Sequence, residues 1–461
     1  MKRLIYTFIA LIFMAGTSVV MSAQQNNTRT AYFLDNYTYG YRLNPAFDSE
    51  MNFFAIPVLG NVSLGAESSV GLSNFLYPSS NGKLTLFIDD SVSSQEFLNG
   101  INDRNMLNAN LNLTLLATGF RTGKLYHTID VSVKANENAV LSKSLFDFVK
   151  VGTANGNNAW QINNVGLGMD VFGEVAYGLS TSIGESLRIG ARLKVLMGMA
   201  HADVNVDKLD LSLSEENWTA SSTGSVEIAG PIEFGTTENN NVDLSSIGLG
   251  EINGLSGFGF GVDLGASYRF LDYFTASVSV LDLGFISWKN MTKASSTGNN
   301  SYYFDGFGTM DSTDDLTAGL QGLTDELLSL VQFEKVNETK GNSPLSATLH
   351  AGIEAEMPFY DRLSFGLLGT HRFNGAYSWT EGRLSANVTP VDCIGLAVSG
   401  GVSNFGASFG GIVNFVFPGF NLFVGADSFL VKVSPQFIPV KKFNTNLALG
   451  LNITFGKGQK E

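Results

Sequence analysis

The sequence predicts an all-β protein: a transmembrane antiparallel β-barrel of about 14 strands, with 16 as the alternative, a short N-terminal plug and helices in its loops. Three observations support this fold class. Segments of about ten residues alternate between apolar and polar side chains. No run of about 18 or more strongly apolar residues follows the N-terminal region, so no helical membrane span is expected there. Short and long connections between these segments alternate along the chain, as in outer-membrane barrels.

Composition excludes several classes of protein. The chain has 461 residues, of which 44% are hydrophobic and only 15% charged, whereas about a quarter of a soluble domain is usually charged. The net charge is -14, so nucleic acid is not an expected partner, because its binding requires a basic surface. Cys393 is the single cysteine, which excludes a disulfide framework and a cysteine-based zinc site. We predict no cofactor and no metal site.

The N-terminus has the three parts of a secretory signal peptide. Lys2 and Arg3 precede an apolar stretch at residues 4–20, and Ala23 offers a cleavage point. The alternative, a membrane anchor, is disfavoured by the short length of the stretch and the small residues at its end. We therefore predict export by the general secretory route. The expected parts of the chain are a signal peptide (1–23), a plug segment (24–60), a barrel (61–456) and a C-terminal tail (457–461).

The alternating segments assign side chains to two faces of the barrel wall. In residues 187–197 the odd positions are apolar, while Arg192 and Lys194 lie on the other face. Three later segments share this period: residues 262–270, 347–357 and 443–455. A soluble β-sandwich has similar patterns. In a membrane barrel, Leu193 would face lipid and Arg192 would face the lumen.

The lengths of the connections orient the barrel. Short turns are expected near Thr122, Ser182, Asp272, Tyr360, Asp392 and Pro418. Long loops are expected at about 68–108, 136–167, 230–256 and 285–345. The strand count depends on residues 203–229, where Lys208 would interrupt the lipid-facing side at a cost of about 2–4 kcal/mol. We therefore place this pair of strands partly outside the membrane and favour 14 strands over 16.

Two loop segments have the periodicity of an amphipathic helix. Residues 314–333 carry a leucine-rich stripe, with Thr313 and Asp314 as candidate caps. Residues 141–150 carry a second stripe, which is a candidate landing site for an apolar ligand. The residues of this candidate site are Leu141, Leu145, Phe146, Phe148 and Val149. The alternative is that both stripes simply pack on the rim of the barrel.

A short motif, Asn44-Pro45-Ala46, precedes the first expected strand and is followed by Ile-Pro-Val-Leu-Gly-Asn at residues 56–61. Pro45 fixes its own φ and favours extended geometry at Asn44, whose side chain can hydrogen-bond its own backbone. An Asn-Pro-Ala in this position resembles the FadL/TodX superfamily of outer-membrane barrels. With the later segment at residues 144–148, the chain looks like a Bacteroidetes branch of that group, known as a domain of unknown function.

The resemblance implies a 14-stranded barrel whose lumen is plugged by the N-terminal segment. It also implies passive uptake of hydrophobic small molecules, which bind extracellular loops and leave sideways through an opening in the wall. A related member, PorV, carries secreted cargo, so the resemblance equally allows a membrane anchor or shuttle for a secreted partner protein. A non-specific porin and a soluble exported β-protein are further alternatives. The expected partners are therefore outer-membrane lipid, a hydrophobic small molecule and a secreted protein.

Charged residues on the lumen side form a candidate ladder of ion pairs. Its members are Asp170, Glu174, Arg188, Arg192, Lys194, Asp263, Arg269, His350 and Glu354. We expect the ladder to stabilise the barrel and anchor the plug; the alternative is a polar path or a carboxylate-binding site. A Ser-His-Asp hydrolase needs three groups that converge, and no nucleophile-elbow motif supports one. We therefore predict that the chain is not an enzyme.

Overall fold

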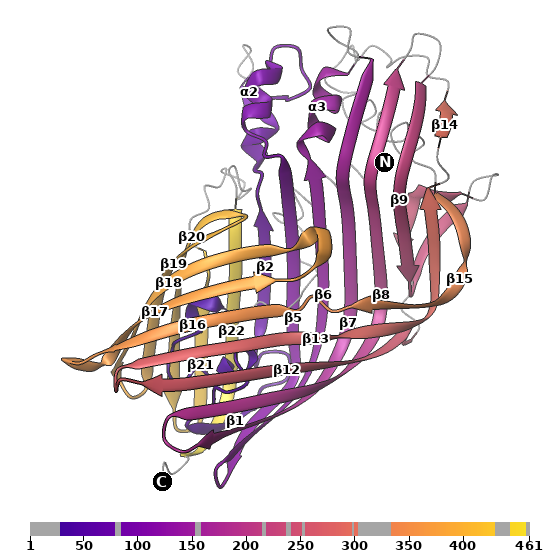
Figure 1. Cartoon of the computed structure of the whole chain (residues 1–461). Helices are drawn as coiled ribbons and strands as arrows, with labels where there is room; N and C mark the ends of the chain where they lie inside the picture. Colours follow the sequence, from indigo (N-terminus) through magenta and orange to yellow (C-terminus); the bar gives the residue numbers. More distant parts are fainter. Residues whose placement is uncertain are drawn as a thin grey trace.

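The computed structural model describes residues 28–78, 84–152, 158–213, 218–236, 241–250, 254–296, 299–302, 333–428 and 443–457. Fourteen antiparallel strands close into a barrel (Figure 1). In pairing order the wall strands are β2 (Val62–Ser68), β5 (Arg104–Thr122), β6 (Leu125–Ser142), β7 (Ala159–Ile183), β8 (Leu187–Leu213), β12 (Gly257–Phe270), β13 (Phe274–Ser296), β16 (Thr348–Met357), β17 (Tyr360–Arg372), β18 (Trp379–Val391), β19 (Ile394–Ser403), β20 (Gly406–Phe417), β21 (Phe420–Ala426) and β22 (Phe443–Lys457). The pairing of β22 with β2 closes the ring. The predicted fold class and the favoured count of 14 are confirmed.

Two short strands, β1 (Met51–Ala55) and β2, together occupy one strand position in the ring. β1 pairs with β22 and β5, and β2 pairs with the same two strands further along. Between them, residues 56–61 leave the regular ladder, and Val58 takes a left-handed φ of 68°. The wall therefore already begins at Met51, within the segment 24–60 that the sequence analysis assigned to the plug. The interruption breaks the two-residue period, so alternation could not reveal that both pieces occupy one strand position.

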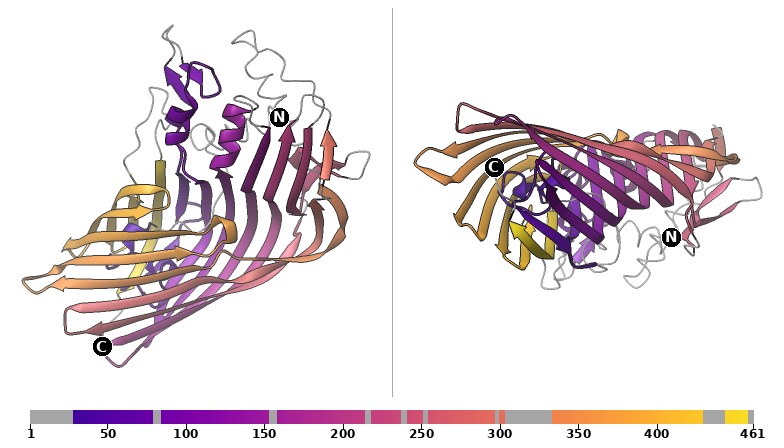
Figure 2. Two further views of the ribbon diagram at one scale, coloured as in Figure 1. Left: turned by 45° about the horizontal axis from the view of Figure 1, so that its top comes forward. Right: turned by 90° about the horizontal axis from the view of Figure 1, so that it is seen from below.

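The wall of the barrel is much taller on one side than on the other. Turns of two or three residues join β5 to β6, β7 to β8, β12 to β13, β16 to β17, β18 to β19 and β20 to β21. All six lie where the sequence predicted short connections. At the opposite end, β7 and β8 run for 25 and 27 residues, although about 9–11 residues suffice to cross a membrane. The side of the barrel formed by β5 to β8 therefore rises well above the side formed by β16 to β21 (Figures 1 and 2).

Further strands extend this tall side without joining the ring. They are β9 (Trp218–Ala229), β10 (Ile232–Thr236), β11 (Val242–Leu249), β14 (Asn299–Tyr302) and β15 (Phe333–Pro344). β9 lies between β8 and β13, so the uncertain pair at residues 203–229 adds no strand to the ring. The long loop expected at 136–167 is wrong in part, because β6 continues to Ser142 and β7 begins at Ala159.

Helices are short and lie in the lumen or at the tall end. They are η1 (Arg29–Ala31), η2 (Gly40–Arg42), η3 (Leu72–Asn74), α2 (Ser94–Asn99), α3 (Lys143–Val151) and η5 (Gly375–Tyr377); two small strands, β3 (Leu76–Pro78) and β4 (Leu84–Leu86), pair near α2. In the described parts of the chain, no helix has the length and apolar character to cross a membrane. The helix predicted at 314–333 lies outside the described residues, except for Phe333, which begins β15.

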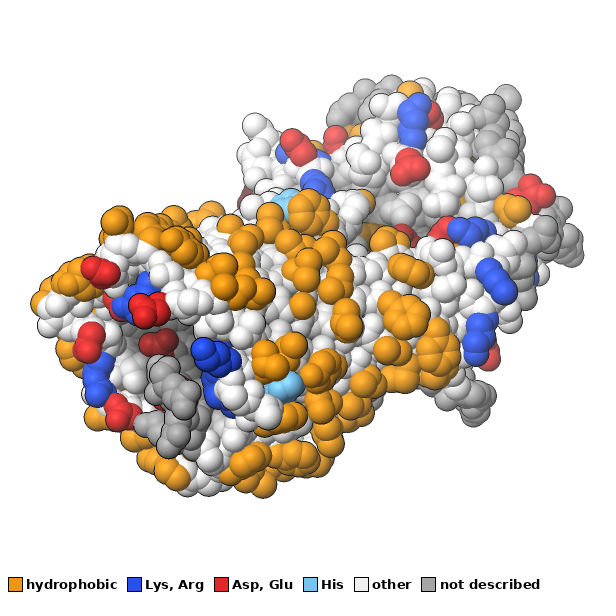
Figure 3. Space-filling model, turned by 60° about the horizontal axis from the view of Figure 1, so that its bottom comes forward, with side chains coloured by type: hydrophobic (Ala, Val, Ile, Leu, Met, Phe, Trp, Pro, Cys, Tyr) orange, Lys and Arg blue, Asp and Glu red, His pale blue; other side chains and the backbone are white. Residues whose placement is uncertain are grey.

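An apolar belt surrounds the barrel. On the face shown in Figure 3, hydrophobic side chains cover the flank, whereas acidic and basic side chains gather towards the two ends. More than half of the residue's surface is exposed at each of these belt residues: Leu193, Phe260, Leu384, Val398, Val402 and Phe409. Between them, inward-facing residues such as Arg192 and Arg383 are only 2% exposed. The predicted parity, with Leu193 outside and Arg192 inside, is confirmed.

Candidate functional site

The N-terminal segment, residues 28–50, lies inside the barrel, as the view from below shows (Figure 2). Tyr39, Tyr41 and Leu43 are at most 3% exposed and pack against inward-facing apolar side chains of the wall. Tyr39 Oη also donates a hydrogen bond to Asn452 Oδ1 on β22, at 2.8 Å. Aromatic rings therefore fill the cross-section at this level, and we call residues 28–50 the plug.

Glycines in the wall create the space that the plug occupies. A Cβ at Gly190 of β8 would lie 1.9 Å from the carbonyl oxygen of Pro45, and one at Gly265 of β12 would lie 2.0 Å from Asn44 Oδ1. Both distances are far below van der Waals contact, so only glycine permits this approach. Asn44 Oδ1 accepts a hydrogen bond from the Ala46 N–H at 2.9 Å, which is the local bond expected from the sequence. The structure thus places Asn44-Pro45-Ala46 directly against the wall.

A buried network of ion pairs lies beside the plug. Arg192 contacts Asp130 at 2.6 Å and Asp263 at 2.9 Å. Lys194 contacts Asp263 at 2.6 Å and Asp282 at 2.5 Å. Two further contacts complete the network: Lys134 to Glu174 at 2.6 Å, and Arg42 of the plug to Asp130 at 2.5 Å. Four cations thus meet four carboxylates in what we call the central network, which satisfies the requirement that buried charges be paired.

A second network anchors the beginning of the plug. Arg29 contacts Glu67 of β2 at 3.1 Å, Glu381 of β18 at 3.0 Å and Asp427, which follows β21, at 3.5 Å. Arg383 contacts Glu381 at 2.8 Å. The backbone N–H groups of Arg29 and Thr30 also donate to the Asp427 carboxylate. One plug residue therefore joins three wall positions that are far apart in the sequence.

The structure brings together four of the nine predicted ladder residues: Glu174, Arg192, Lys194 and Asp263. The other five lie elsewhere: Asp170 contacts His201, Arg188 contacts Asp48, Arg269 contacts Glu356 at the exposed end, His350 contacts Thr370, and Glu354 is in no ion pair of these networks. The alternation along each strand assigned these side chains to the lumen but did not give their positions along the barrel axis. In the described ranges, no group of three or more His, Cys, Asp or Glu side chains is placed to hold a metal ion.

The sequence analysis missed half of the central network, including Asp130, Lys134 and Asp282. Asp130 and Lys134 were detectable in principle, because they lie four residues apart and share one parity on β6. Asp282 could not be detected from the sequence, because the register between β12 and β13 shifts at this point and Asp282 takes a φ of 57°. A β-bulge of this kind inserts a residue and reverses the parity that follows.

The candidate landing site lies in and next to α3, which is capped by Ser142. Leu141 is the next-to-last residue of β6, and Phe146 and Phe148 are each 3% exposed. Phe146 packs against Phe75 and Phe97, and Phe148 against Trp160. Leu145 and Val149 are partly buried against the same clusters. The apolar stripe is thus covered by protein in this state, and ligand binding at these residues stays a prediction.

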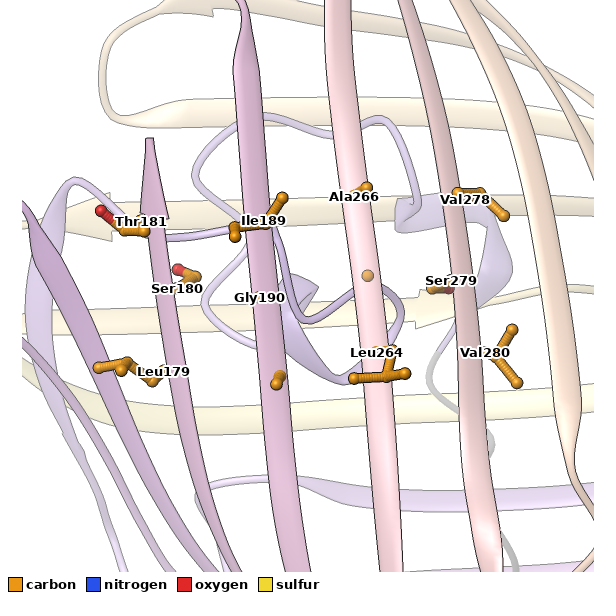
Figure 4. Close-up of a pocket in the computed structure, with 12 residues that line it drawn as sticks. Leu179, Ser180, Thr181, Ile189, Gly190, Leu264, Ala266, Val278, Ser279 and Val280 are labelled. Atoms are coloured by element: carbon orange, nitrogen blue, oxygen red, sulfur yellow. The ribbon is translucent and has the colours of Figure 1, made fainter. Parts of the chain in front are cut away.

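A groove of about 500 Å³ lies on the outer face of β7, β8, β12 and β13 (Figure 4). The outward-facing side chains that line it are Leu179, Thr181, Ile189, Ala191, Leu264, Ala266, Val278 and Val280. Gly190 and Gly265 also line it, and the positions that their Cβ atoms would take are occupied by Asn44 and Pro45. A single layer of backbone therefore separates this apolar groove from the plug.

Residues 45–427 match the model of the "Family of unknown function (DUF5723)". The chain belongs to this family. The prediction of a branch known as a domain of unknown function is thereby confirmed. No curated protein sequence matches this family member.

Several solved structures are similar to this family member. One is the Pseudomonas putida toluene transporter TodX, with 7% identity, 97% of this chain and 98% of that chain covered, and a TM-score of 0.38. Another is the Ralstonia pickettii toluene transporter TbuX, with 10% identity, 96% of this chain and 98% of that chain covered, and a TM-score of 0.41. A third is a Pseudomonas aeruginosa FadL homologue, with 11% identity, 98% of each chain covered, and a TM-score of 0.38.

Proposed function

We propose that the chain is an exported outer-membrane barrel that binds a hydrophobic small molecule and passes it passively between the lumen and the membrane. The observation that carries this proposal is the apolar groove next to Asn44 and Pro45. Its lining is almost entirely apolar, and only the backbone at Gly190 and Gly265 separates it from the plug. The floor of the groove is thus the backbone of β8 and β12, and Asn44 and Pro45 of the plug lie directly behind it. No covalent chemistry is proposed.

A non-specific porin is not supported. An open pore requires a water-filled lumen, whereas Tyr39, Arg42 and Asn44 of the plug are at most 3% exposed. The central network and the Arg29 network would both have to break before the plug could leave. We infer that the lumen is closed at the level of the plug in the resting state.

The position in the membrane is tested by one substitution in the belt. Leu193→Arg should cost about 2–4 kcal/mol of membrane folding free energy, because it places a cation on the lipid-facing side. Phe359→Arg is the matched control, since Phe359 lies in a turn at the end of the barrel and is 81% exposed. In a gel run with and without boiling, we expect only Leu193→Arg to reduce the fraction of protein that migrates as the folded form. Equal folding of both variants in membranes would argue against a lipid belt at Leu193.

Ligand binding is tested by filling the groove. Ala191→Trp and Ala266→Trp add bulk to two of its lining positions, whereas Val402→Trp introduces the same side chain at a belt residue outside it. We expect the first two variants to bind a fluorescent fatty acid or a monoaromatic probe roughly tenfold more weakly, a change of about 1.4 kcal/mol, and the control to bind normally. Unchanged binding of the probe by both groove variants would mean that the groove is not the ligand-binding site.

A second candidate function is a membrane anchor for a secreted partner protein. It is favoured by the tall side of the barrel, because β7 and β8 each extend well beyond the length needed to cross a membrane. Mass spectrometry of the native detergent-purified protein distinguishes the two functions. A bound apolar compound supports transport, whereas a stoichiometric secreted protein on a ligand-free barrel supports the anchor.

A further inference from the structure

The connection between β17 and β18, residues 373–378, crosses the mouth of the barrel at the end opposite the short turns. It contains η5, and we call it the strap. In the ring, β17 and β18 lie nearly opposite β6 and β7, yet η5 contacts β6 and the ring of Tyr377 lies on β7. The strap therefore joins two opposite walls above the plug.

Tyr377 docks into a slot made by two glycines of β7. A Cβ at Gly166 would lie 2.8 Å from Tyr377 Oη, and one at Gly168 would lie 3.2 Å from the Tyr377 ring. Tyr377 Oη donates a hydrogen bond to Asp203 Oδ1 on β8, at 3.3 Å. Within the described residues, this is the one hydrogen bond from the strap to the opposite wall. The rest of the attachment is close packing, which any side chain at Gly166 would disturb.

The phenol is suited to this role because it keeps its proton. Burial and the nearby Asp203 carboxylate hold the pKa of Tyr377 well above its usual value. The hydroxyl therefore keeps its proton near neutral pH and can donate it to Asp203. Removal of the hydroxyl alone would break the bond and leave the ring in place.

The strap is also connected to the plug. Tyr377 belongs to an apolar cluster with Trp379 and Phe405 on one wall and Met106 and Val140 on the other. The Trp379 ring lies under the guanidinium of Arg29, 5.0 Å from its centre, within the range of a cation–π contact. Arg29 is the residue that anchors the beginning of the plug. A continuous set of contacts thus runs from the strap through Trp379 to the plug.

We propose that the strap is a lid over this mouth of the barrel, held closed by Tyr377 in the glycine slot, and that its release loosens the anchor of the plug at Arg29. This inference goes beyond ligand binding at the outer groove, because it assigns control of the plug to the opposite side of the lumen. It requires no particular ligand. The lid would open when any partner or solute competes for the slot or for Asp203.

Two reporter cysteines in a Cys393→Ser background test the proposal. Val140→Cys reports on the cluster beneath the strap, and Thr28→Cys reports on the beginning of the plug; the native side chains are 1% and 0% exposed. Each reporter is combined with Gly166→Ala, which crowds Tyr377, or with Gly382→Ala, where the new Cβ would have no atom within 4 Å. The readout is the rate of labelling by a membrane-impermeant maleimide, on protein whose folding is verified by its gel mobility without boiling.

We expect Gly166→Ala to accelerate labelling of both reporters roughly tenfold, the effect of about 1.4 kcal/mol on the opening equilibrium, and Gly382→Ala to leave both rates unchanged. Tyr377→Phe should give a smaller rise of roughly two- to tenfold, because it removes one hydrogen bond. This second variant keeps the test decisive if Gly166→Ala fails to fold. Unchanged labelling at Val140→Cys in the folded variants would overturn the lid. Faster labelling there with a protected Thr28→Cys would overturn the coupling to the plug.

Discussion

Arg192→Leu should lower the free energy of unfolding by about 3–5 kcal/mol, the usual cost of removing one partner from a buried ion pair. Arg192 lies between Asp130 and Asp263, and the side chains of both acids are at most 1% exposed. Its loss leaves four carboxylates against three cations in a site with little access to water. The measurement is a urea titration of the protein in detergent or liposomes, with the folded fraction read from the gel mobility without boiling.

The matched control is Arg362→Leu. Arg362 contacts Asp392 at 2.9 Å, but the two side chains are 41% and 80% exposed, and pairs of this kind contribute at most about 1 kcal/mol. The double variant Arg192→Leu/Asp263→Asn restores the balance of charge and should recover part of the lost stability, since Lys194 keeps Asp282 as a partner. Equal, small losses for Arg192→Leu and Arg362→Leu would mean that the central network is no stronger than a surface pair.

Gly190→Ala should displace the plug from the wall. The new Cβ would lie 1.9 Å from the Pro45 carbonyl oxygen and 2.7 Å from the Ala46 nitrogen, so the clash is with backbone and no side chain can turn away. The wall at Gly190 is held by ladders to β7 and β12 on both sides, whereas the plug segment at Pro45 belongs to no strand. We therefore expect the plug to move and the barrel to stay folded.

The measurement is maleimide labelling of Ala46→Cys, in a Cys393→Ser background, because Ala46 is 0% exposed in the seated plug. Gly190→Ala and Gly265→Ala should both raise its labelling rate at least tenfold, together with the conductance of single barrels in a planar bilayer. Gly369→Ala is the control, because its Cβ would meet a neighbour only at the ordinary distance of 3.7 Å. Protected Ala46→Cys in two folded glycine variants would contradict the close fit of plug and wall.

The alternation of side chains predicted much of the wall correctly. Leu193 is exposed and Arg192 buried, as expected, and all six predicted short turns are present. This success has a physical cause, because a strand with lipid on one side and protein on the other repeats every two residues. The prediction failed where the backbone departs from that repeat. The interruption at residues 56–61 concealed β1, and the bulge opposite Asp263 concealed Asp282.

The charged site was only half predicted, because membership of a network depends on height as well as on parity. Arg188, Arg192 and Lys194 share one face of β8, yet Arg188 contacts Asp48 near the short turns, apart from the central network. Height along a tilted barrel is set by the stagger between neighbouring strands, which the sequence of one strand does not contain. The same reason explains why Asp130 and Arg42, more than 80 residues apart, were not recognised as partners.

The sequence by itself determined the class of the fold, the residues that face outwards, the positions of the short turns and the local turn at Asn44. Each of these depends on interactions within a few neighbouring residues or on one repeating period. Only the tertiary structure decided the partners of Arg29 and Arg192, the fit of Pro45 against Gly190 and the docking of Tyr377 on the far wall. These contacts join segments that closure of the ring and the stagger of its strands bring together, and no local pattern records that geometry.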